Sequence, residues 1–124
     1  MLVGSGKRKA LGKRERTRRA RRSKHNSHLK KTYGIDIDEY DKILAGQDGV
    51  CAICRGGTSK RHFAVDHNHK TGQIRGLLCA RCNRGLSVFM DRIDNLRAAV
   101  KYMKANGEKV NKILGRKTTH EESL

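Results

Sequence analysis

Four cysteines in two closely spaced pairs constrain the fold of this chain most. Two residues separate Cys51 from Cys54 and Cys79 from Cys82, and 24 residues lie between the pairs. Each pair can present two sulfurs to one tetrahedral ion, so the pattern predicts a structural zinc site with four thiolate ligands. Two disulfides are the alternative, which we disfavour because the sequence shows no secretion signal. A thioredoxin-type redox pair fits less well, because the two motifs flank a hairpin-like segment.

The apolar content of the chain predicts a small core. Its 124 residues include no Trp, two Phe and three Tyr, and 35% of them are hydrophobic. The length suits one domain, and a folded body of about 75 residues is near the size at which a metal helps to decide whether a chain folds. We therefore expect a small α+β domain whose folding depends on zinc.

Positive charge is concentrated at the N-terminus. Residues 1–31 hold 13 Lys and Arg against a single acid, Glu15, a net charge of +12 out of +17 for the chain. This segment has few apolar residues and no apolar period, so we expect a disordered basic arm. Such arms usually bind polyanions, nucleic acid above all, while a solubilising or localising tail is the alternative.

Hydrophobic periodicity predicts a helix and then a hairpin in the body. Residues 32–50 are typical of a short helix, with a capping box formed by Asp36 and Glu39. Residues 62–66 and 73–78 are typical of two strands joined by a turn. The hairpin therefore lies between the two cysteine pairs.

A long helix is predicted after Cys79, ending at Asn106 and Gly107. Its apolar stripe comprises Leu86, Phe89, Met90, Ile93, Leu96, Val100 and Met103. We interpret the stripe as core or as a helix–helix contact, which allows a homodimer through this helix. Residues 108–124 have few apolar anchors and are expected to form a short, fraying C-terminal tail.

Three polar residues are predicted to converge near the start of that helix. Asp66 and His67 end the first strand, and Asn83 directly follows Cys82. The hairpin runs into the helix and the zinc ties the same two places, so their side chains should meet. Carboxylate and amide oxygens suit Mg²⁺, and a neutral imidazole can accept a proton from water.

One geometric condition applies to this site. Neighbouring residues of a regular strand point to opposite faces, so the strand must end or twist for Asp66 and His67 to face the same site. His69 is a rival base, because it has the same facing as His67 if the strand continues. A single histidine here is otherwise a polar surface residue.

The run that joins these motifs resembles a known family. The segments YGIDIDEYDKIL, CAIC and AVDHNHKTGQIRGLLCARCNRGL, within residues 33–103, are similar to the phage recombination endonuclease VII family of the HNH or His-Me finger nucleases. The resemblance implies a ββα-metal core beside the structural zinc, over residues 32–107. It implies His67 as general base and Asp66 and Asn83 as ligands of a catalytic Mg²⁺ or Mn²⁺, and it suggests His69 as an auxiliary residue.

The expected function is therefore that of a metal-dependent DNA endonuclease, hydrolysing phosphodiester bonds by nicking or by cleaving branched DNA. Candidate phosphate-binding residues surround the hairpin and the helix start: Lys60, Arg61, Lys70, Arg75, Arg81 and Arg84. A noncatalytic zinc-ribbon protein that binds nucleic acid is the alternative, and a disabled nuclease kept for protein contacts is a third. We expect no membrane partner and a cytoplasmic location, in the host cell if a phage encodes the chain.

Overall fold

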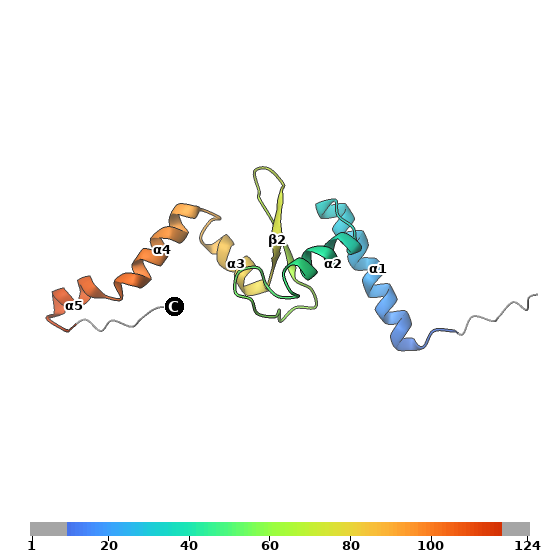
Figure 1. The fold of residues 1–124 in the computed structure, drawn as a ribbon, viewed down its shortest axis with the longest axis horizontal. Coiled ribbons are helices and arrows are strands. Elements are labelled where there is room, and N and C mark those ends of the chain that lie inside the picture. Colours follow the sequence, from blue (N-terminus) through green and yellow to red (C-terminus); the bar gives the residue numbers. More distant parts are fainter. Residues whose placement is uncertain (1–9, 118–124) are drawn as a thin grey trace, which may run out of the picture.

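The computed structural model describes residues 10–117, which form a small α+β fold of five helices and one two-stranded sheet. The elements are α1 (Lys13–Tyr33), α2 (Ile37–Gly46), β1 (Ala64–His67), β2 (Ile74–Leu78), α3 (Ala80–Val88), α4 (Ile93–Ala105) and α5 (Glu108–Leu114). The hairpin and α3 lie at the centre of the molecule, with α1 and α2 on one side (Figure 1). On the other side, α4 and α5 extend away from the centre.

Helix α1 corrects the prediction of a disordered arm for residues 13–31. Leu29 is only 1% exposed and packs in the core with Tyr40. The Asn26 side-chain oxygen accepts a hydrogen bond from the backbone N–H of Ile37 at 2.9 Å, which links α1 to the start of α2. The sequence gives little sign of this docking, because one deeply buried leucine in a basic helix produces no apolar period. Residues 1–9 of the expected arm lie outside the described residues.

Helix α2 begins with the predicted capping box. The Asp36 carboxylate accepts the N–H of Glu39 at 2.8 Å, and the Glu39 carboxylate accepts the N–H of Asp36 at 3.2 Å. The helix is shorter than the predicted segment 32–50 because its cap starts it only at Ile37. From its buried side, the Tyr40 hydroxyl donates to the carbonyl of Phe63 at 3.0 Å, which holds the segment before β1 against α2.

The two strands form the predicted antiparallel hairpin with an irregularity at the expected place. Asp66 pairs with Gly76 and His67 pairs with Ile74, so Arg75 is the extra residue of a bulge. A bulge disrupts the alternation of facing along the strands. The register is therefore irregular between Asp66 and His67, but the extra residue lies on β2 and not on the strand that carries these two residues.

The core is small and has two parts. One part contains Leu29, Tyr40, Val65 and Leu77, and the other contains Cys51, Leu78 and Cys79. Phe63 packs against both. The second part is thus built largely of the thiols that were predicted to bind zinc.

The predicted long helix is two helices. Met90 and Asp91, with φ angles of 59° and 53°, lie in the left-handed region between the end of α3 and the start of α4. This conformation cannot continue a right-handed helix. The Asn95 side-chain amide donates to the carbonyl of Phe89 at 3.1 Å and so caps the break.

The apolar stripe expected on one long helix is largely exposed. Met90, Ile93 and Met103 are 70%, 67% and 75% exposed. The interpretation of the stripe as core is therefore wrong for these residues, because the break turns α4 away from the hairpin (Figure 1).

The C-terminal helices follow the predicted end signal. Asn106, with a φ of 47°, ends α4, and α5 begins directly after Gly107. Part of the expected tail is thus helical, while residues 118–124 lie outside the described residues. None of the helices in the described part of the chain combines the length and the hydropathy needed to cross a membrane.

Candidate active site and metal centre

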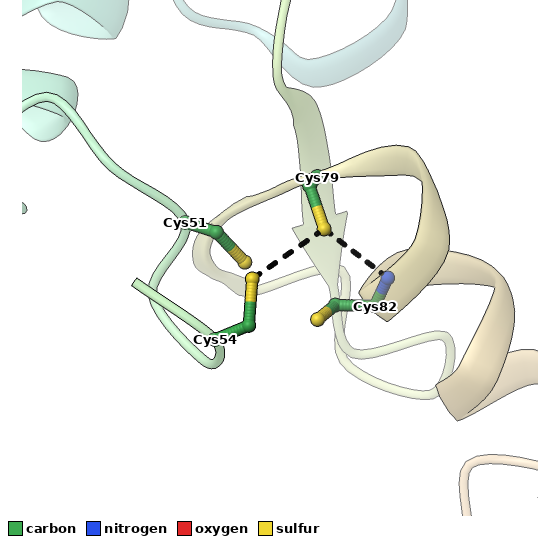
Figure 2. Close-up of side chains that lie close together, drawn as sticks. All are labelled: Cys51, Cys54, Cys79 and Cys82. Atoms are coloured by element: carbon green, nitrogen blue, oxygen red, sulfur yellow. Dashed lines mark hydrogen bonds between the residues drawn. The ribbon is translucent and has the colours of Figure 1, made fainter. Parts of the chain in front are cut away.

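The four cysteines form a single thiol cluster (Figure 2). Their Sγ atoms all lie within 4.8 Å of one another, and all four cysteines are free of disulfides. The Sγ atoms of Cys54 and Cys79 are 3.8 Å apart. A zinc tetrahedron with bonds of about 2.3 Å has sulfur–sulfur edges of about 3.8 Å. The cysteines are therefore placed to bind a structural metal such as zinc, as predicted.

Backbone groups of the two knuckles support this cluster. The N–H of Gly56 donates to the Sγ of Cys54 at 3.4 Å, and the N–H of Cys82 donates to the Sγ of Cys79 at 3.4 Å. The N–H of Cys51 donates to the carbonyl of Gly56 at 2.9 Å and closes the first knuckle. Such N–H donors favour negative charge on sulfur.

The thiols differ in their tendency to ionise. Burial opposes ionisation of Cys51, but backbone hydrogen bonds from Cys79 and Cys54 outweigh it and lower the pKa of the Cys51 thiol to about 6. Burial, together with the neighbouring sulfurs, raises the pKa of Cys82 to about 12. The backbone hydrogen bond from Cys82 also lowers the pKa of Cys79. The cluster thus favours thiolates at Cys51 and Cys79 but resists ionisation of Cys82, and a bound cation relieves that resistance.

Gln47, which the sequence analysis did not single out, attaches the zinc site to the sheet. Its Nε2 donates to the carbonyls of Val50 and Leu77, both at 2.9 Å, and its Oε1 accepts the N–H of Leu77 at 2.9 Å. A Cβ at Gly76 would approach that Oε1 to 3.1 Å, so glycine allows the amide to pair with β2. No sequence pattern predicts that a glutamine after a helix will make the hydrogen bonds of a neighbouring strand.

A cleft of about 600 Å³ lies between the hairpin and the α3–α4 break. Asp66, Asn83 and His69 line it, so the structure brings together three of the four predicted active-site residues. Asp66 is only 8% exposed. Within residues 10–117, no hydrogen bond engages the side-chain amide of Asn83. A carboxylate and an amide oxygen in one cleft are suitable ligands for Mg²⁺ or Mn²⁺.

His67 stands beside this group rather than on the wall of the cleft. Its ring centroid is 4.5 Å from that of His69 and 5.7 Å from that of Tyr33 at the end of α1. His69 thus lies on the cleft wall, and the ring of His67 contacts both His69 and Tyr33.

Arg75 is engaged by two carboxylates. Its Nε and Nη2 donate to the two oxygens of Asp66 at 2.8 and 3.0 Å, and its Nη2 and Nη1 donate to those of Asp91 at 2.7 and 3.2 Å. The hydrogen bonds to Asp66 and Asp91 raise the pKa of Arg75. The hydrogen bonds from Arg75 lower the pKa of Asp91. As a predicted phosphate contact, Arg75 is thus already paired within the protein.

The other residues predicted to contact phosphate differ from Arg75 in their surroundings. Lys70 lines the cleft, whereas Arg81 and Arg84 are exposed on α3. In the part of the chain that the structure describes, these three residues form no ion pair. Arg61 lies elsewhere, on a hollow of about 1110 Å³ between α1 and the segment before β1.

Comparison with known families assigns the chain. The family model of recombination endonuclease VII matches residues 26–105. The chain belongs to the recombination endonuclease VII family. The match runs from the docked end of α1 to the end of α4, so it includes the thiol cluster and the cleft of this endonuclease VII family member.

Two curated phage proteins are similar to the chain. The chain is 46% identical over 74 residues to the Gene 59 protein of Mycobacterium phage L5 and 45% identical over 75 residues to that of Mycobacterium phage D29. These matches cover 58% and 59% of this chain and 45% and 46% of the relatives, so the chain spans about half the length of the curated proteins that it matches. No solved structure matches the chain.

Asp91 is the residue of this site that sequence reasoning missed. It lies in the α3–α4 break and lines the cleft together with Asp66. Because the sequence predicts one continuous helix there, Asp91 was not expected to turn back toward the hairpin. The only local signal is the pair Asp91 and Asn95, polar residues able to support a helix end.

Proposed function

We propose that this chain is a divalent-metal-dependent DNA endonuclease that hydrolyses phosphodiester bonds. The convergence of Asp66 and Asn83 on one cleft carries the proposal, because β1 and α3 supply them separately. The family assignment supports the same reaction, and a ββα-metal core of the His-Me finger type corresponds to β1, β2 and α3. We propose residues 32–107 as the nuclease domain.

The chemistry follows from the groups available. His67 accepts a proton from water, which attacks the phosphorus in line with the leaving 3′ oxygen. A divalent ion held by Asp66 and Asn83 would supply Lewis-acid stabilisation of the charge that develops on the phosphate. Lys70, on the wall of the cleft, is suited to hold a flanking phosphate.

Two histidines, His67 and His69, are candidates for the general base. The family resemblance favours His67, while the position of His69 on the cleft wall makes it the auxiliary residue or the rival base. The centroids of the two rings lie 4.5 Å apart, so both imidazoles are candidates for the base. Separate substitution of each histidine distinguishes the two roles.

DNA is the proposed partner, and α1 contributes to binding it. The helix carries ten Lys and Arg and one acid along about 30 Å. Contacts from these residues to phosphates bind without reading sequence and weaken with salt. Arg81 and Arg84, exposed on α3, are further candidates for phosphate contacts.

Cleavage of supercoiled plasmid tests the function. The zinc-loaded protein with Mg²⁺ should nick the plasmid, and His67→Ala and Asp66→Asn should each abolish nicking. Asp94→Asn, an exposed acid on α4, is the matched control and should cut like the parent. A panel of linear duplex, nicked plasmid and a four-way junction then identifies the preferred substrate.

One observation favours a noncatalytic nucleic-acid-binding protein instead. Both oxygens of Asp66 accept hydrogen bonds from Arg75, which is also how a purely structural carboxylate is held. Retained plasmid binding without nicking, across several divalent metals and pH values, would support that alternative and contradict the nuclease.

Two further predictions from the sequence remain proposals. A homodimer would bury apolar side chains of α4 such as Ile93 and Met103, and light scattering of the purified chain measures its mass directly. A cytoplasmic location, in the phage-infected host cell, is proposed from the mycobacteriophage relatives and is tested by fractionation.

A further inference from the structure

The guanidinium of Arg75 lies between two carboxylates at the wall of the cleft. Four hydrogen bonds of 2.7 to 3.2 Å join it to Asp66 and Asp91. The Asp66 side chain is 11% exposed and that of Asp91 is 29% exposed, so solvent screens these contacts incompletely. Arg75 is therefore the local counter-charge of the proposed metal ligand Asp66.

Two irregularities of the backbone create this arrangement. The bulge leaves Arg75 as the unpaired residue opposite Asp66 and His67. The left-handed conformation at Met90 and Asp91 ends α3 and turns Asp91 back toward the sheet. Both Arg75 and Asp91 thus occupy places that regular secondary structure would not give them.

The contacts have a consequence for cation binding. A bidentate guanidinium uses both oxygens of Asp66, and its positive charge lies beside any cation bound there. Asp91 offers the same guanidinium a second bidentate partner at comparable distances. Arg75 can therefore release Asp66 without losing all its acceptors.

We propose that Arg75 competes with a divalent cation for the Asp66 carboxylate, and that Asp91 weakens this competition by holding Arg75 when the cation binds. This inference rests on the proposed function, because it takes Asp66 as a ligand of the ion. Arg75 and Asp91 are positioning residues, since they act through Asp66 and not on the phosphate.

Titration with Mn²⁺ alone tests the competition, using the zinc-loaded full chain without DNA and calorimetry as the readout. Arg75→Gln should bind Mn²⁺ about tenfold more tightly, because a repelling charge is removed from beside the ion. Arg75→Lys keeps that charge and should stay within about twofold of the parent. Asp91→Asn should bind several-fold more weakly, since Arg75 then has only Asp66 as a carboxylate partner.

The double variant separates the proposed role of Asp91 from a direct one. If Asp91 acts through Arg75, Asp91→Asn should have no effect in the Arg75→Gln background. An equal weakening in both backgrounds would mean that Asp91 binds or attracts the ion itself, and it would overturn this part of the inference. Weaker Mn²⁺ binding by Arg75→Gln, as a loosened fold would give, would overturn the competition.

A further variant distinguishes failure of this inference from failure of the proposed function. Asp66→Asn should abolish the Mn²⁺ binding seen in the parent. Unchanged binding in Asp66→Asn would contradict both the proposed ion site and the competition. Loss of binding in Asp66→Asn with unchanged binding in Arg75→Gln would contradict the competition alone.

Discussion

Gln47 connects the zinc site to the sheet through one side chain. Its amide makes the donor and acceptor contacts that a neighbouring strand would make with Leu77, and it also bonds to the carbonyl of Val50. Leu77 is fully buried, so water has little access to its backbone groups if the amide is removed. The Leu77 carbonyl also accepts the N–H of Ala52 at 3.1 Å, so Gln47 contributes chiefly by satisfying the buried N–H of Leu77.

Gln47→Ala should lower the free energy of unfolding by about 1–3 kcal/mol, the usual cost of leaving buried polar groups without partners. Urea unfolding of the zinc-loaded protein measures this change. Gln73→Ala is the matched control, because Gln73 is exposed and should alter stability by less than about 0.5 kcal/mol. Equal effects of the two substitutions would contradict the role assigned to Gln47.

Single residues differ in how far the sequence could predict them. Cys51 and Cys54 were predictable as metal ligands because a knuckle depends only on local spacing. Arg75 was predictable as a basic residue near the cleft, but its two acid partners were not, since one of them depends on the break at Asp91. Pairing across a tertiary contact leaves no local pattern in the sequence.

At the scale of elements, α1 docks through a small set of rings. His25 stacks on His62 with centroids 3.8 Å apart and meets Tyr40 edge-on at 4.8 Å. Partial burial lowers the pKa of both histidines, and the charge each would place on the other adds to the effect at His25. The docked helix therefore favours neutral imidazoles.

Stability of the docked helix should fall in acid. Both pKa values lie below the ordinary histidine value of 6.5, so the unfolded chain binds protons more readily, and the free energy of unfolding decreases as the pH falls through 6.5. Urea midpoints between pH 8 and 5 measure the slope, which His62→Gln should reduce.

The charged neighbours of His25 modify this slope without reversing it. Arg22 and His28 disfavour the protonated ring, while Asp41 favours it. His28→Gln is the control that should keep most of the parent slope. A midpoint that rises on acidification would show that Asp41 dominates and would contradict the stacking argument.

Elements were predictable where their start and end signals are local. The capping box of Asp36 and Glu39 defines the start of α2 from sequence alone, and Asn106 with Gly107 defines the end of α4. The α3–α4 break was missed because Met90 and Asp91 adopt a left-handed backbone that sequence patterns usually reserve for glycine or asparagine.

For the whole molecule, the metal is expected to decide whether the central body folds. The second half of the core consists of Cys51, Leu78 and Cys79, and the knuckles join the loop after α2 to the start of α3. Removing the metal would leave buried thiols in place of a bonded centre. The thiol cluster therefore contributes to the core as well as holding the two knuckles together.

A zinc-selective chelator should abolish the cooperative unfolding transition and reduce helical circular dichroism, with recovery when Zn²⁺ is restored. Cys54→Ser should weaken metal retention in the same direction, because one of the four thiolates is absent. Unchanged circular dichroism and an unchanged transition after complete metal removal would contradict a structural role for the site.

Two truncations of α1 separate its expected contribution to DNA binding from its contribution to folding. Deleting residues 1–20 removes eight Lys and Arg but keeps His25, Asn26 and Leu29. DNA binding should weaken, and its dependence on salt should fall by about 0.9 in logarithmic slope for each phosphate that the shortened chain no longer neutralises. Single-turnover cleavage at saturating protein should persist.

Deleting residues 1–31 should have a second effect, because it also removes Leu29 from the core and Asn26 from the start of α2. Loss of a buried leucine costs about 2–5 kcal/mol, a large part of the stability of a body this small. Urea unfolding of both truncated proteins measures the difference. Equal stability of the two truncated proteins would mean that α1 does not dock in solution and that its positive charge only helps to bind DNA. A loss of stability in the longer deletion alone would mean that residues 21–31 of α1 are needed for folding, while residues 1–20 serve DNA binding.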